Sequence, residues 1–121
     1  MKSLNRVTIL GNLGATPELR HTGSNQAVTN FTVATSNSWR DSNGEVQENT
    51  DWHRIVVWGS RAEACTRFLA KGSRVYVEGR LETKCREVNG QKLYTTQIVA
   101  QNVIFLSYKD ETGDSEELYA D

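Results

Sequence analysis

Residues 51–59 read Asp51-Trp52-His53-Arg54-Ile55-Val56-Val57-Trp58-Gly59, a run of β-branched and aromatic residues that ends on a glycine. This composition is typical of a β-strand. Side chains of a strand alternate between two faces. One face therefore carries Trp52, Arg54, Val56 and Trp58, and the other carries His53, Ile55 and Val57. We expect the second face to pack in a core.

Two interpretations compete for the first face. The two tryptophans are either large core residues, with Arg54 extending past them, or a platform on which flat aromatic groups stack while Arg54 pairs with a phosphate. This strand alone does not decide between the two interpretations, and the rest of the sequence is needed to choose.

The composition indicates one small globular domain. The chain has 121 residues, 37% of them hydrophobic, which suits a single domain with a compact core. No apolar run approaches the length of a membrane span, and the N-terminus lacks the apolar region of a secretory signal. We therefore expect Cys65 and Cys85 to be free thiols in a reducing compartment.

Charge divides the chain into two parts. The net charge is −1, but residues 109–121 hold six acids and one base, so residues 1–108 hold thirteen bases and nine acids, a net of +4. We predict a folded domain over 1–108 and a short, acidic, disordered tail over 109–121. A basic domain with an acidic tail occurs in nucleic-acid proteins, although acidic tails also serve solubility.

The pattern along the chain predicts an all-β domain. Strands are expected over 6–12, 27–39, 51–59, 73–83 and 92–106, with a possible short strand over 18–21 and a hairpin turn at Asn89-Gly90. In the fourth strand we place Val75, Val77 and Leu81 on one face. A helix is expected over 61–71, begun by a capping box of Ser60 and Glu63 and ended by Gly72.

This order, three strands, a short helix and a two-stranded hairpin, is that of the five-stranded OB-fold, a Greek-key barrel. A strand over 27–39 would be about 43 Å long. That exceeds the wall of a small barrel, so Trp39 and Arg40 should lie near a rim.

The sequence offers no positive sign of catalysis. His21 and His53 have no zinc-ligand spacing with either cysteine. Gly11-Asn12-Leu13-Gly14 lacks the lysine and the spacing of a phosphate-binding loop. The acids are scattered over polar faces and turns. We therefore expect no enzyme activity, no metal site and no cofactor.

A binding surface for unpaired nucleic acid is better supported. Trp39, Trp52 and Trp58 fall on strands that line the binding face of an OB barrel, and Arg54, Lys84 and Arg86 lie on the same sheet or its hairpin. Stacking on aromatic rings contributes about 1–3 kcal/mol per base and tolerates any base sequence. Cations along the strand add a salt-dependent term. These features favour sequence-independent binding of single-stranded DNA.

The sequence resembles the bacterial-type single-stranded DNA-binding proteins, the homotetrameric OB-fold class. The matching stretches are Val7–Arg20, Phe31–Arg40, Asp51–Gly59, Lys71–Leu81 and Tyr94–Thr96. The resemblance implies a non-enzymatic homotetramer that coats exposed single strands in replication, recombination and repair. It also implies a cytoplasmic, nucleoid-associated location.

The resemblance also implies roles for particular residues. Trp39 and Trp52 match the stacking tryptophans of the family, Trp58 falls where the family often has phenylalanine, and Arg54 matches an arginine of the DNA-binding strand. Arg20 becomes a candidate for a backbone contact, or is a solvated loop charge. His53 and Tyr76 match residues at subunit contacts, although His53 could be a satisfied core histidine and Tyr76 ordinary packing.

Two departures from the family pattern matter. Arg86 stands where an aromatic residue is usual; a guanidinium can stack on a base and pair with a phosphate, so binding should persist with greater salt dependence. The family typically has a long linker and an acidic tip ending in Pro-Phe, whereas this sequence ends in Leu118-Tyr119-Ala120-Asp121.

Recruitment of replication and repair proteins is therefore left open, with the tail either shortened or naturally short as in a phage or mobile-element relative. Two alternative functions also stay open: an OB-fold accessory protein of replication restart and an RNA-binding OB module.

Overall fold

The computed structural model describes residues 2–109 and 115–117. The strands are β1 (Val7–Leu13), β2 (Arg20–His21), β3 (Ala27–Arg40), β4 (Val46–Trp58), β5 (Arg74–Val88), β6 (Gln91–Phe105), β7 (Ser107–Lys109) and β8 (Ser115–Glu117), and the helix is α1 (Ser60–Phe68).

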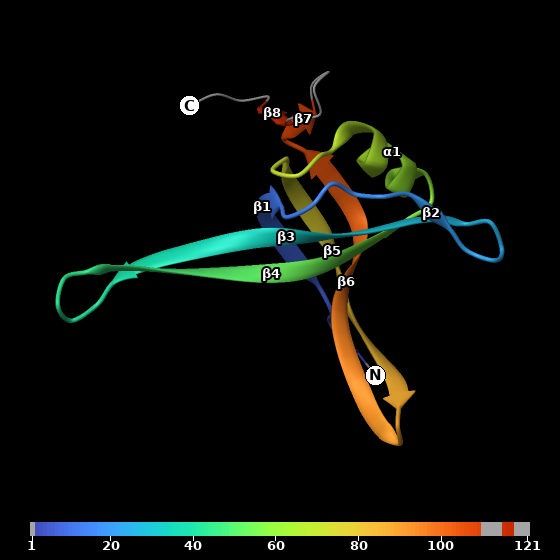
Figure 1. The fold of residues 1–121 in the computed structure, drawn as a ribbon, viewed down its shortest axis with the longest axis horizontal. Coiled ribbons are helices and arrows are strands. Elements are labelled where there is room, and N and C mark those ends of the chain that lie inside the picture. Colours follow the sequence, from blue (N-terminus) through green and yellow to red (C-terminus); the bar gives the residue numbers. More distant parts are fainter. Residues whose placement is uncertain (1, 110–114, 118–121) are drawn as a thin grey trace.

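Five of these strands close a barrel in the order β1-β5-β6-β4-β3, and β3 pairs back with β1. The pair β4–β6 is parallel and the other pairs of the barrel are antiparallel. Gly11 stands where β1 closes on β3, because a Cβ there would run into the carbonyl group of Ala34. The predicted OB-fold is confirmed, with the helix between its third and fourth strands (Figure 1).

The barrel interior is apolar and comes from all five strands and the helix. Ile55 and Val57 are fully buried together with Val33, Val75 and Val77. The predicted core face of the stretch 51–59 is therefore confirmed at its C-terminal half. At its N-terminal half, His53 is only half-buried, because β4 enters the barrel after that point.

Two hairpins extend beyond the barrel (Figure 1). The first arm is residues 36–50, where β3 and β4 stay paired as far as Arg40 opposite Val46. The second arm is residues 83–96, where β5 and β6 stay paired as far as Val88 opposite Gln91. Most arm side chains are exposed. The prediction that the strand beginning at Ala27 outruns the barrel wall is confirmed.

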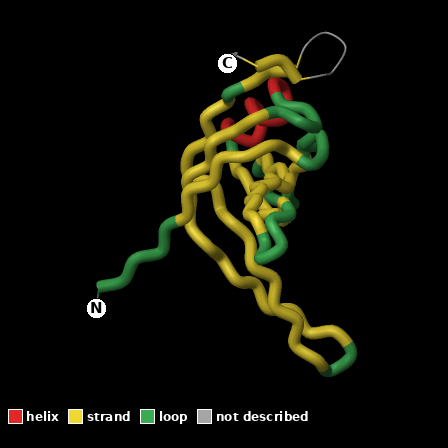
Figure 2. Tube along the Cα trace, turned by 90° about the vertical axis from the view of Figure 1, so that its left-hand side faces the viewer, coloured by secondary structure: helices red, strands yellow, loops and turns green. Residues whose placement is uncertain are grey.

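The helix closes the end of the barrel opposite the second arm (Figure 2). Its predicted capping box is wrong. Gly59 is the N-cap, with φ 74°, and no side chain caps the helix; the carbonyl oxygen of Gly59 instead accepts from the amides of Ala62 (3.0 Å) and Glu63 (3.3 Å). A glycine in the left-handed region turns the chain from strand to helix within one residue, so Ser60 lies inside the first turn.

The helix ends at Phe68, short of the predicted Lys71, because Leu69 adopts an extended conformation. Ala62, Cys65 and Leu69 are buried, whereas Phe68 is exposed. Burial raises the pKa of the Cys65 thiol to about 12, which makes this thiol unreactive.

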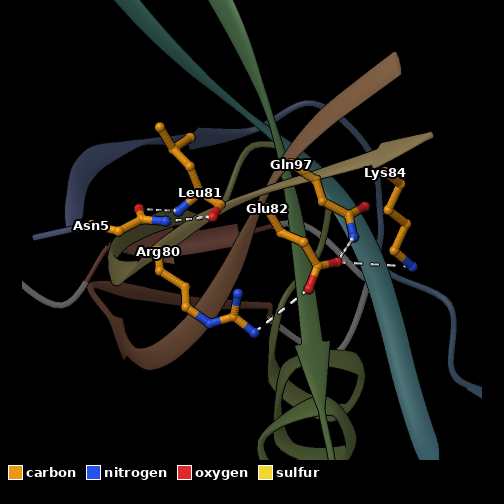
Figure 3. Close-up of polar contacts among 6 residues, drawn as sticks. All are labelled: Asn5, Arg80, Leu81, Glu82, Lys84 and Gln97. Carbon is orange, nitrogen blue, oxygen red and sulfur yellow. Dashed lines mark hydrogen bonds and ion pairs between the residues drawn. The ribbon is translucent and has the colours of Figure 1, made fainter. Parts of the chain in front are cut away.

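The β-bulge opposite Glu78 and Gly79 lies in β6, where Gln101 is skipped between Ala100 and Asn102, so the alternation along β5 is unbroken. Leu81 was expected to share the face of Val75 and Val77, and this is confirmed, because it stands opposite the buried Ile98. Leu81 itself is exposed. The Asn5 side chain pairs with the Leu81 backbone there, donating to its carbonyl oxygen and accepting from its amide, both at 2.8 Å (Figure 3).

The predicted tail, 109–121, lies largely outside the described residues. Of it, the structure describes Lys109 at the end of β7 and Ser115–Glu117 as β8, which pairs antiparallel with β7. Tyr108 of β7 packs edge-on against Phe68 and Phe105, with ring centroids 5.8 and 5.9 Å apart.

Candidate nucleic-acid interface

The outer face of β4 presents the aromatic and basic side chains that its alternation predicts. Trp52 is 60% exposed and Trp58 41% exposed, and Arg54 between them is also exposed. Each stands opposite a residue of β3 in unbroken register: Ala34, Val28 and Thr32 respectively. The indoles therefore lie outside the barrel and are not core residues.

Three neighbouring cavities that share lining residues lie over this face. The first, of about 320 Å³, is lined by Trp58, Lys84 and Arg20 among others. The second, of about 250 Å³, is lined by Trp52 and Arg54, and the third, of about 230 Å³, also by Arg54. Gln97 of β6 lines all three cavities, and Asn30 of β3 lines the first and third. We call the surface lined by these three cavities the outer groove.

The outer groove gathers cations from three separate parts of the chain. Arg20 reaches it from β2, which pairs with the start of β3, and its guanidinium donates to the Asn30 amide oxygen in the amide orientation that satisfies both groups. Arg54 comes from β4 and makes no ion pair within the described part of the chain. Lys84 comes from the start of the second arm.

Gly14 leaves room for the Trp52 ring. A Cβ placed on Gly14 would lie 2.5 Å from Cζ3 of Trp52 and 2.6 Å from Oγ1 of Thr32. The indole thus rests directly against the backbone after β1. The sequence did not predict this role of Gly14, because close packing of a ring on a glycine is not visible in a linear pattern.

Trp39 lies apart from the other two tryptophans. It stands on β3 opposite Gln47 of β4, near the tip of the first arm. On β4, Gln47 is at an odd-numbered position, whereas Trp52 and Trp58 are at even-numbered positions, and the ladder between them is unbroken. Residues directly opposite each other project to the same side, so Trp39 and Trp52 project to opposite sides of the ribbon. Trp39 is 48% exposed and lines none of the three cavities.

Asp41 organises the tip of the first arm. Its Oδ1 accepts from the amides of Asn43 and Glu45, both at 2.9 Å, and its Oδ2 accepts from Nε2 of Gln47 at 3.1 Å. These bonds, the one from Glu45 foremost, lower the pKa of Asp41. Since Gln47 stands opposite Trp39, the turn helps to fix the end of the ribbon that carries this ring.

Arg86 extends the basic surface along the second arm. It stands opposite Leu93 on the same side as Lys84, which stands opposite Thr95. Arg86 is exposed and lies beyond the three cavities. The structure therefore brings Trp52, Trp58, Arg20, Arg54 and Lys84 together in the outer groove, and leaves Trp39 and Arg86 on the two arms.

Two polar groove residues, Asn30 and Gln97, were not predicted from the sequence, and neither was Glu82, which lies beside the groove and accepts from Gln97. Gln97 and Glu82 stand opposite each other in the β5–β6 register. Alternation along 27–39 and 92–106 could have placed Asn30 and Gln97 on the outer faces of their strands, but nothing local distinguishes them from ordinary solvated residues.

The two predicted subunit-contact residues lie in different places. His53 is half-buried beside Trp52, and its Nε2 is 2.7 Å from Oγ1 of Thr35. Tyr76 is half-buried on the outer face of β5, between Leu10 of β1 and Ile104 of β6 in register. Leu10 and Ile104 are 47% and 44% exposed, so they form with Tyr76 an apolar row across three strands.

Neither a metal cluster nor a membrane helix occurs in residues 2–109 and 115–117. No group of three or more His, Cys, Asp or Glu side chains there could hold a metal ion. The described helix is also too short and polar to cross a membrane.

The comparison with protein families is decisive for identity. Residues 4–106 match the model of the single-strand binding protein family. The chain belongs to this family. The match covers the whole barrel and both arms, and single-stranded DNA binding is the function that it supports.

Relatives and solved structures agree with this assignment. The chain is 48% identical over 114 residues to single-stranded DNA-binding protein 1 of Chlorobaculum tepidum, covering 93% of this chain and 70% of that protein. It superposes on the Plasmodium falciparum SSB in complex with single-stranded DNA with a TM-score of 0.80 at 36% identity, covering 88% of this chain and 97% of that one.

A deletion mutant of the single-stranded DNA-binding protein from Thermus aquaticus gives a TM-score of 0.75 at 31% identity. That match covers 93% of this chain but 54% of the Thermus protein.

Proposed function

We propose that the outer groove binds single-stranded DNA by stacking bases on Trp52 and Trp58, while Arg20, Arg54 and Lys84 contact the phosphates. The observation that carries this proposal is the placement of two exposed indoles at neighbouring cavities of the same face, both lined by Gln97. A buried tryptophan serves a core, but an indole about half exposed leaves a ring face free for a base.

The energetics favour binding without regard to base sequence. Each stacked base contributes about 1–3 kcal/mol on any aromatic platform, and each neutralised phosphate adds a term that weakens with salt. We therefore propose coating of exposed strands, without enzymatic chemistry, during replication, recombination and repair, in the cytoplasm with the nucleoid.

The two arms extend the proposed path. Arg86 continues the basic side of the second arm away from Lys84, so a bound strand can follow that arm. Trp39 is on the opposite side of the first arm from Trp52. A strand that stacks on both rings must therefore pass around the edge of the ribbon or run onto another subunit.

We propose that the protein assembles as a homotetramer, with the apolar row Leu10, Tyr76 and Ile104 in one of its interfaces. This row lies on the outer face of β1, β5 and β6, which carry none of the groove tryptophans. Exposed apolar rows of this kind are typical of contact surfaces. His53 remains a proposed contact residue, with Thr35 as its partner within the chain.

The assembly can be tested separately from DNA binding. Sedimentation equilibrium of the wild type should give four times the chain mass, and Tyr76→Glu should reduce it by burying an unpaired charge at the contact. A wild-type protein that sediments as a monomer would refute the tetramer.

The main experiment is a titration of tryptophan fluorescence with oligo-dT, a DNA duplex and oligo-U at two salt concentrations. We expect strong quenching by oligo-dT, weak quenching by the duplex, and an affinity for oligo-dT that falls with salt. Equal affinity for the duplex would contradict the proposal, and a clear preference for oligo-U would favour the RNA-binding alternative.

A further inference from the structure

An acidic side chain lies among the cations that border the outer groove. Glu82 is on β5 at the root of the second arm, and its Oε2 is 3.5 Å from Nη2 of Arg80. Its Oε1 is 3.9 Å from Nζ of Lys84 and accepts a hydrogen bond of 3.0 Å from Nε2 of Gln97. Figure 3 shows the carboxylate between these three donors.

The position of this carboxylate is unusual for the molecule. Within residues 2–109 and 115–117, the two ion pairs of the structure both end on Glu82. Two of its three partners belong to the groove: Lys84 lines the cavity beside Trp58, and Gln97 lines all three cavities. An anion is therefore already present where a nucleic-acid backbone would pass.

We infer that Glu82 occupies a phosphate position of the outer groove and acts as a built-in competitor that sets the affinity and salt dependence of strand binding. This inference rests on the proposed function. A carboxylate and a phosphate bind the same ammonium, guanidinium and amide donors. The donors that face Glu82 are therefore those that a backbone phosphate would use, namely Arg80, Lys84 and Gln97.

The ion pairs of Glu82 are weak enough for a phosphate to displace its carboxylate from Arg80 and Lys84. The side chains of Arg80, Glu82 and Lys84 are 44%, 31% and 62% exposed, and exposed ion pairs are weak. Both charge–charge distances are longer than a strong charge-assisted hydrogen bond of about 2.8 Å. A phosphate can take over these donors, but the carboxylate then stays nearby and repels it.

This role predicts that the affinity for the strand and the salt dependence of that affinity change together when Glu82 is replaced. Cations already paired with Glu82 neutralise fewer phosphates and release fewer counterions, so Glu82 weakens binding and flattens its salt dependence. The opposite role, in which Glu82 holds Arg80 and Lys84 in a productive position, predicts that loss of the carboxylate weakens binding. The sign of the effect separates the two.

The test compares Glu82→Gln with Glu87→Gln. Gln at 82 keeps the shape of the side chain and an oxygen that can accept from Gln97. Glu87 is on the same arm at an odd position opposite Lys92, so the control removes the same charge from the other side of the hairpin. The affinity of each variant for oligo-dT is measured over a series of salt concentrations.

We expect Glu82→Gln to bind oligo-dT about two- to fivefold more tightly at low salt, the range of an exposed charge pair. Its plot of log affinity against log salt should be steeper by about 0.7 for each phosphate gained. Glu87→Gln should remain close to the wild type. In a Lys84→Met background the gain from Glu82→Gln should shrink, because one of the competed donors is gone.

Weaker or unchanged binding by Glu82→Gln would overturn the inference, as would an equal gain in Glu87→Gln or a full gain without Lys84. The proposed function has its own readout in the same data. If the wild type fails to bind oligo-dT, both proposals are refuted. If the wild type binds and Glu82→Gln has no effect on affinity, only the inference about Glu82 is refuted.

Discussion

The barrel and the two arms are made of the same continuous strands, yet they are stabilised in different ways. In the barrel, Val33, Ile55 and Val75 are almost fully buried. In the arms most side chains are exposed, and cross-strand hydrogen bonds such as Ser36–Thr50 and Thr83–Thr96, both 3.2 Å, accompany the backbone ladder. The core thus stabilises the barrel, whereas the arms expose their side chains for contacts outside it.

The candidate site lies at the junction between the barrel and the two arms. Trp52 and Trp58 bracket the point at which β4 enters the barrel, and Lys84 and Gln97 lie at the root of the second arm. The junction combines a rigid base with exposed side chains. This combination suits a surface that must hold rings in place and still leave them open to bases.

The largest difference between the two regions should appear in stability. Ile55→Ala removes a buried side chain of the barrel and should lower the free energy of unfolding by about 2–5 kcal/mol. Asn37→Ala, on the exposed first arm, should change it by less than about 0.5 kcal/mol. Urea denaturation of both variants measures this, and similar losses would contradict the division into core and arms.

The next largest effect concerns the contact between Gly14 and the Trp52 ring. Gly14→Ala should displace the Trp52 ring, since the added Cβ would lie 2.5 Å from it. We expect a loss of about 1 kcal/mol in affinity for oligo-dT, part of the value of one stacked base. Gly23→Ala is the matched control, because a Cβ there meets nothing within 4 Å. Equal affinities of the two variants would show that the ring position does not matter.

A smaller effect tests whether the second arm carries DNA. Arg86→Ala should weaken binding modestly and reduce the slope of log affinity against log salt by about 0.7, the contribution of one phosphate. Lys92→Ala removes a cation from the other side of the same hairpin and should leave the slope unchanged. An unchanged slope in Arg86→Ala would remove the second arm from the proposed path.

The smallest effect is confined to the tip of the first arm. Hydrogen bonds to the carboxylate lower the pKa of Asp41 below its ordinary value of 3.8. The stabilisation is therefore present above that value and is lost as the pH falls through the lowered pKa. Amide exchange should show Glu45 losing protection at acid pH before Ile55 does. Asp41→Asn should abolish this difference in pH dependence, and its persistence would assign it to another group.

The sequence predicted the barrel well because burial leaves a strong periodic signal. The alternation of Ile55 and Val57 against Trp52 and Trp58 is visible in nine residues, and it placed the indoles outside once the fold was known. The length of the strand from Ala27 also predicted the first arm, since the rise per residue is nearly constant.

What the sequence could not predict depends on single-residue events. A left-handed Gly59 replaced the expected cap of the helix, and Leu81 is exposed although it shares the face of Val75 and Val77. The side of Trp39 depends on the register of a long ladder, which alternation within one strand does not give. The roles of Gln97 and Glu82 arise only when distant strands come together.

The central claim is that Trp52 and Trp58 hold unpaired bases, and the most direct measurement is the affinity of the double variant Trp52→Ala, Trp58→Ala for oligo-dT. Both rings are exposed, so the variant should keep the wild-type fold by circular dichroism. We predict an affinity at least about tenfold lower, as expected for two lost stacking platforms. A folded double variant that binds oligo-dT as tightly as the wild type would contradict the account.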